Sequence, residues 1–214
     1  MALRPEEPTI PRDARPITVP ATCLAAFLAV WAVCAISPHS REDWVLENLV
    51  TFVGVPIAVF TFRRFRFSDR SYVQATIFLI LHTIGAHYTY SLVPLGDWVG
   101  GALGLARNHF DRVVHFSFGL LMMRPMRELG FRHDPKLGRF AKLYFSTAGI
   151  GLWSMIYEIV EWLVASTVDP AAGTAYLGTQ GDPWDAQKDM GLALLGAFIA
   201  SAFQFSSDGR PTTE

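Results

Sequence analysis

Long apolar runs, separated by short polar segments, dominate the pattern of this chain. A helix needs about 20 predominantly apolar residues to cross a hydrocarbon core of about 30 Å. By that measure the pattern predicts six membrane-spanning helices, roughly at residues 18–36, 44–62, 71–93, 111–126, 142–165 and 189–205. The fourth and sixth are the weakest, because each is short and has an acidic residue in its first turn. One of them could be re-entrant instead.

These segments predict an all-α fold, a polytopic transmembrane helical bundle of about six spans. It would form one domain over residues 18–205, between a flexible tail at residues 1–17 and a polar tail at residues 206–214. The composition agrees, because 51% of the residues are hydrophobic and only 17% are charged. An average soluble domain has about 25% charged residues. The bilayer is therefore the first expected partner, and nucleic acid binding is not expected.

Basic residues are concentrated in two of the predicted connections, between the second and third spans and between the fourth and fifth. Short loops rich in Lys and Arg stay in the cytoplasm, so both termini are expected there too. The connection before the sixth span is acidic and belongs outside. Val33–Ala35 loosely resembles a signal-peptide cleavage site. A retained first span is the better interpretation, because its removal would leave an odd number of spans.

With this topology, nearly every acid or imidazole within or beside a predicted span falls near the outer side, including Glu47. Ionisable groups in a bilayer are costly and mark functional sites. The candidate catalytic residues are Glu158 and Glu161. His82 is deeper and ranks lower. The candidate ligands for a divalent metal such as zinc are His87, His109, Asp111, His115, Asp182, Asp185 and Asp189.

The spacing of these residues supports a shared site. Asp111 and His115 are four residues apart and share a helix face, which suits joint ligation or a carboxylate orienting an imidazole. Glu158 and Glu161 are three apart, and two such carboxylates repel unless a cation, a proton or an Arg lies between them. Imidazoles and carboxylates together can form a zinc or dimetal site, whose bound water is a nucleophile near neutral pH.

The segment 178–189 is rich in Gly, Asp and Gln, which is more typical of a binding loop than of a spacer. Its aspartates would form an acidic stripe if a helix began as early as Pro183. Simpler interpretations exist for these residues. A lone intramembrane His is more often a hydrogen-bonded packing residue than a ligand. Asp111 with Arg107 or Arg112, or Asp189 with Lys188, could form ion pairs that only hold helix ends.

Three segments resemble the motifs of the YjdF-like inner-membrane proteins, a family carrying a domain of unknown function. They are His109–Phe116 (HFDRVVHF), Tyr157–Trp162 (YEIVEW) and Gly178–Met190 (GTQGDPWDAQKDM). The resemblance covers most of the chain from the second span to the sixth. It implies a multi-pass helical protein of the bacterial inner membrane. It does not imply a reaction.

Three hypotheses for the function remain at this point. The first is a metal-dependent hydrolase of a lipid or envelope substrate, favoured because a mixed set of imidazoles and carboxylates suits a transition metal. The second is a proton- or cation-coupled transporter, in which the same carboxylates take up the ion. The third is a non-catalytic membrane protein whose polar cluster holds the helices together. The pattern assigns neither a substrate nor an oligomeric state.

Overall fold

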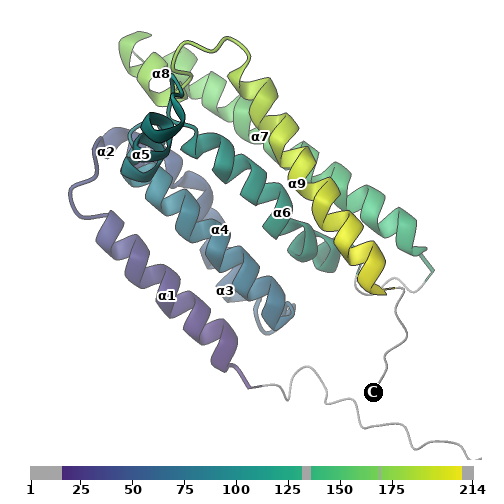
Figure 1. The fold of residues 1–214 in the computed structure, drawn as a ribbon. Coiled ribbons are helices and arrows are strands. Elements are labelled where there is room, and N and C mark those ends of the chain that lie inside the picture. Colours follow the sequence, from purple (N-terminus) through teal and green to yellow (C-terminus); the bar gives the residue numbers. More distant parts are fainter. Residues whose placement is uncertain (1–15, 132–135, 169, 209–214) are drawn as a thin grey trace, which may run out of the picture.

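The computed structural model describes residues 16–131, 136–168 and 170–208 (Figure 1). Most of both predicted tails, residues 1–15 and 209–214, therefore lies outside the described residues. Within the described ranges every regular element is a helix, which confirms the all-α prediction. The helices are α1 Thr18–Cys34, α2 Arg41–Glu47, α3 Leu49–Thr61, α4 Asp69–His87, α5 Pro94–Leu103, α6 Phe110–Phe131, α7 Arg139–Thr167, α8 Pro170–Leu177 and α9 Asp185–Asp208.

The long helices α1, α4, α6, α7 and α9 lie alongside one another, and the short helices α2, α5 and α8 gather at one end (Figure 1). Each predicted span overlaps one of the long helices, or α2 with α3. By length and hydropathy, α7 could cross a membrane alone, and α2 and α3 could do so as one bent pair. The number of spans and the orientation stay predictions.

The predicted span at residues 44–62 is not one straight helix, which corrects the sequence-based expectation. It breaks between α2 and α3, and the two helices meet at an angle of 42°. The fully buried Asn48 occupies the break. Its side-chain amide donates to the Trp44 carbonyl at 2.7 Å, and its amide oxygen accepts from the Trp31 indole at 2.8 Å. These hydrogen bonds satisfy the polar groups that a break exposes.

The two weakest predicted spans are in fact long helices. α6 has 22 residues and α9 has 24, so each helix extends beyond the short apolar run predicted from the sequence. Whether either one crosses the membrane stays a prediction. They pack closely, because glycines remove side chains where the two backbones meet. A Cβ atom at Gly119 would collide with the Ala193 carbonyl oxygen, and one at Gly196 would collide with the Phe116 carbonyl oxygen. This glycine and alanine seam is typical of helix pairs in membranes.

Local capping explains several helix ends near the short helices. The Ser40 side chain accepts a hydrogen bond from the Asp43 amide and caps α2. α5 begins with Pro94 at its first position and ends at Gly104, which has a left-handed φ of 65°. α4 ends at His87 rather than continuing to residue 93, because Thr89 and Tyr90 adopt left-handed conformations with φ of 49° and 52°.

Part of the basic sequence lies at the end of the bundle opposite the short helices. The α3–α4 connection, which holds Arg63, Arg64 and Arg66, lies at the end away from α2, α5 and α8 (Figure 1). The α8–α9 connection, which holds Asp182, lies at the other end. The helix order thus places the polar candidates together at one end, as the sequence predicts. Which end faces the cytoplasm stays a prediction.

Candidate functional site

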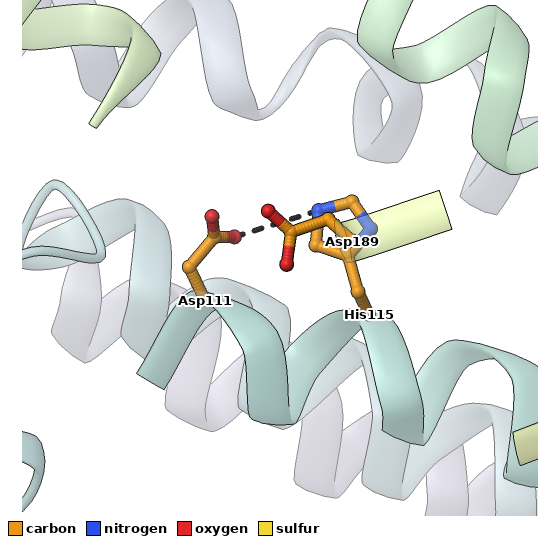
Figure 2. Close-up of side chains that lie close together, drawn as sticks. All are labelled: Asp111, His115 and Asp189. Carbon is orange, nitrogen blue, oxygen red and sulfur yellow. Dashed lines mark ion pairs between the residues drawn. The ribbon is translucent and has the colours of Figure 1, made fainter. Parts of the chain in front are cut away.

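Asp111, His115 and Asp189 come together between α6 and α9. Each offers one ligand atom, and these atoms all lie within 4.8 Å of one another. Figure 2 shows Asp111 and His115 projecting from the same side of α6, with the Asp189 carboxylate beside them. Asp189 is 2% exposed and His115 is 8% exposed. The prediction that Asp111 and His115 share a face agrees with this geometry.

The α6–α9 seam accounts for this arrangement. On α6, Asp111, His115 and Gly119 follow one another at intervals of four residues and so lie in one stripe. On α9, Asp189 and Ala193 have the same interval. Because Gly119 and Ala193 bring the two backbones into contact, the side chains one turn or two turns away are held at close range. The glycine contact therefore sets the separation between the acidic groups.

Glu158 of α7 places a third carboxylate beside this group. Its Oε1 atom lies 3.5 Å from His115 Nε2, and Asp111 Oδ1 lies 3.5 Å from the same nitrogen. Zinc bonds of 2.0–2.1 Å in a tetrahedron give ligand-to-ligand edges of about 3.3–3.4 Å. The Asp111–His115 distance is close to this value, whereas the three ligand atoms of the group as a whole lie within 4.8 Å of one another. Among the described residues, Glu158 Oε1 and Asp189 Oδ1 are buried without a hydrogen-bond partner. The Asp111, His115 and Asp189 group thus offers donor atoms of the kinds that can hold a metal ion.

Asp182 and Asp185, also predicted as ligands, are engaged by arginines. Arg107 binds both oxygens of Asp185, at 2.6 and 3.2 Å. Arg112 donates to Asp182 at 2.5 Å and to Asp185 at 3.2 Å. Hydrogen bonds from Lys188, the Trp184 amide and Arg112 lower the pKa of Asp182 to about 2. These two carboxylates are therefore already neutralised, and we leave them out of the ligand set proposed below.

The arginines take part in a wider contact between two loops. The side-chain amide of Gln180 accepts from the Asn108 backbone N–H and donates to the Asn108 carbonyl, both at 2.9 Å. Arg107 also donates to the Thr179 carbonyl at 3.1 Å. α9 begins at Asp185, not as early as Pro183, so Asp182 belongs to this loop rather than to a helical stripe. The segment predicted as a binding loop is fixed against the start of α6.

His87 and His109 lie outside the group around Asp111. His87 Nδ1 contacts the Cys34 carbonyl oxygen at 2.7 Å, which ties the end of α4 to the end of α1. His109 Nδ1 lies 3.3 Å from the Arg112 guanidinium. Burial lowers the pKa of His109, and the neighbouring arginines lower it further. The geometry therefore places these two histidines in other contacts, away from the Asp111, His115 and Asp189 group.

A second buried polar group borders the first. Tyr157 donates to Glu47 Oε2 at 2.5 Å, and the Tyr157 ring lies edge-on to the His115 ring with centroids 5.9 Å apart. Glu47 is 3% exposed. Glu161, one turn after Glu158 on α7, interacts electrostatically with Glu47 and Glu158. Carboxylates from α2, α6, α7 and α9 therefore converge on one region.

Tyr157 is the residue that sequence reasoning missed. A tyrosine near the end of an apolar helix is usually explained as an interface anchor. Its position next to Glu158 in the sequence was the signal that could have indicated a role in the site. The indicator of a role in the site is its contact with Glu47, which lies 110 positions earlier in the chain. No periodicity within one helix can reveal such a contact.

Comparisons with known proteins identify the chain as a membrane protein. The family model described as "Predicted membrane protein (DUF2238)" matches residues 19–208. The "Inner membrane protein YjdF" of Escherichia coli (strain K12) is 32% identical over 192 residues, which covers 90% of this chain and 91% of the relative. No solved structure gives a significant match. The resemblance and the inner-membrane location predicted from the motifs are confirmed, and the chain belongs to this family of predicted membrane proteins.

Proposed function

We propose that this protein binds a divalent metal such as zinc through Asp111, His115 and Asp189, and that it hydrolyses a lipid or envelope substrate. The observation that carries the proposal is the meeting of these ligand atoms within 4.8 Å inside the bundle. Buried carboxylates of this kind are costly in their ionised form unless a cation compensates the charge. The unpartnered oxygens of Asp189 and Glu158 support the same interpretation.

The side chains have separate roles in this proposal. A bound metal supplies a water or hydroxide nucleophile near neutral pH. Asp111, His115 and Asp189 hold the metal, and Glu158, 3.5 Å from His115, accepts the proton of the attacking water. Glu161, one turn further along α7, passes that proton on. In the predicted orientation the site lies near the outer surface of the bilayer, where a lipid ester or phosphoester can reach it.

A cation-coupled transporter is the second candidate. Five carboxylates gather in one region, on Glu47, Asp111, Glu158, Glu161 and Asp189, and none forms an ion pair with Lys or Arg in the described part of the chain. Such an excess of buried negative charge attracts protons or cations whether or not chemistry follows. Both candidate functions use the same binding site. In the hydrolase the bound cation activates water, and in the transporter the bound cation is carried across the membrane.

Metal binding is the first experiment. The protein purified in detergent is loaded with zinc, dialysed and measured by elemental mass spectrometry and by titration calorimetry. We expect about one zinc per chain, and a loss of at least tenfold in affinity for Asp189→Asn and His115→Ala, since each removes a ligand. Asp182→Asn is the matched control, because its carboxylate is occupied by Arg112 and Lys188. Wild-type protein without zinc would contradict the proposal.

The reaction is tested separately from the metal. Zinc-loaded protein is incubated with a bacterial envelope lipid extract, and products are identified by mass spectrometry. We expect metal-dependent hydrolysis that Glu158→Gln abolishes while zinc stays bound. If zinc binds but no product forms, and proteoliposomes accumulate the cation in a Glu158-dependent manner, the transporter replaces the hydrolase.

A further inference from the structure

Glu47 is a buried carboxylate that the proposed metal site does not use. It is the last residue of α2, directly before the break at Asn48. The break frees its backbone carbonyl from the regular helical pattern, and His82 Nε2 contacts this oxygen at 3.1 Å. His82 Nδ1 in turn lies 2.6 Å from the Tyr90 hydroxyl. The backbone carbonyl of Glu47 is thus fixed by His82 of α4.

The turn after α4 places Tyr90 for this contact. Thr89 and Tyr90 have positive φ angles, which non-glycine residues seldom adopt. The turn folds the Tyr90 ring back against Gly85, where a Cβ atom would meet the ring closer than 3.0 Å. The Tyr90 amide also donates to the Gly85 carbonyl at 2.8 Å. Strained backbone of this kind persists where the surroundings require it, frequently at functional sites.

The side chain of Glu47 points the other way, toward α7. Tyr157 donates to its Oε2 atom at 2.5 Å. The Tyr157 ring then packs edge-on against His115, with an angle of 70° between the ring planes. The connection therefore runs from Glu47 through Tyr157 to the imidazole of the ligand set. Partners that orient a ligating histidine are as important to a metal site as the ligands themselves.

We infer that Glu47 is a positioning residue for the metal site: by fixing Tyr157 it sets the orientation of the His115 ring. This inference rests on the proposed function. The break between α2 and α3 is then the feature that brings Glu47 across the bundle, in the way that interrupted membrane helices line sites in other proteins. The hydrogen bond needs an acceptor oxygen on residue 47, which glutamine also offers.

The experiment compares zinc affinities of purified full-length variants by calorimetry. Tyr157→Phe and Glu47→Ala are each expected to weaken zinc binding about 10- to 100-fold, the range found for orienting partners. The double variant should lose no more than the stronger single variant, because both act through one hydrogen bond. Glu47→Gln should restore affinity to within about threefold of wild type, because its carbonyl oxygen still accepts from Tyr157.

Two matched controls accompany these variants. Glu42 is an exposed carboxylate on the same helix as Glu47, and Tyr144 is a 60% exposed tyrosine on the same helix as Tyr157. Glu42→Gln and Tyr144→Phe should bind zinc as the wild type does. Unchanged affinity in Tyr157→Phe, or no recovery in Glu47→Gln, would overturn the inference.

A measurement on the metal-free protein separates this inference from the proposed function. The NMR signals of the His115 ring should shift in Tyr157→Phe and Glu47→Ala and return in Glu47→Gln. That result in a protein that binds no zinc would support the positioning contact and contradict the metal site. Zinc binding by the wild type, with identical His115 signals in all variants, would support the metal site and contradict the positioning contact. The absorption bands of the cobalt-loaded protein provide a second readout, because they report the geometry around the metal.

Discussion

Gly119→Ala is expected to separate α6 from α9 and so weaken the proposed metal site. The added Cβ atom would overlap the Ala193 carbonyl oxygen and approach the Ala197 amide nitrogen closer than 3.0 Å. These are backbone atoms, so no side chain can rotate away, and the helices must move apart by at least about 1 Å to restore ordinary contact. Overpacking of this kind costs roughly 1–3 kcal/mol.

The same displacement acts on the ligands. Asp189 is one turn before Ala193, and His115 is one turn before Gly119. A movement of about 1 Å exceeds the tolerance of about 0.2 Å in metal–ligand distances, so zinc affinity should fall at least tenfold. Thermal unfolding in detergent and zinc calorimetry measure the two effects. Gly130→Ala is the control, because it lies on the same helix with nothing within 4 Å of its added Cβ. Wild-type values for Gly119→Ala in both assays would refute the reasoning.

Two further substitutions test the contacts around the site. Arg107→Ala leaves the 6% exposed Asp185 with only the 3.2 Å contact to Arg112, so we expect a loss of about 2–4 kcal/mol in unfolding free energy. Proteolysis of the 178–184 loop should rise with it, and resistance equal to wild type would contradict the docking contact. Asn48→Ala leaves the Trp31 indole without its acceptor and should cost about 1–3 kcal/mol. Thermal unfolding measures this, and a more stable variant would argue against a role for Asn48 in the break.

The helices and the gathering of polar residues could be predicted from the sequence. Apolar runs located the long helices, since hydrophobic length is a local property of the chain. The basic connections grouped the polar residues at one end before any contact was known. The break at Asn48 could not be predicted, because a single Asn in an apolar run is compatible with a continuous helix. Its hydrogen bond to Trp31 depends on packing between two helices.

The sequence also could not predict which acidic residues bind arginine and which lie beside His115. Asp185 and Asp189 are four residues apart and look equivalent in the sequence. In the structure Asp185 binds Arg107, whereas Asp189 faces His115 and Asp111. The choice depends on which side of α9 meets Arg107 and Arg112, at and before the start of α6, and this follows from the glycine contacts between the two helices. Burial and pairing are long-range properties, so spacing alone cannot assign them.

The seam between α6 and α9 also has a consequence for how the protein is made. Asp189 lies on a helix that is synthesised after all the others described, so the three-ligand group cannot form while the earlier helices alone are in the membrane. Asp111, His115 and Glu158 can meet as soon as α6 and α7 pack together, since they come from these two helices. Asp189 joins them only when α9 docks beside α6. The complete group therefore depends on the last of the described helices, and a chain that stops before α9 lacks it.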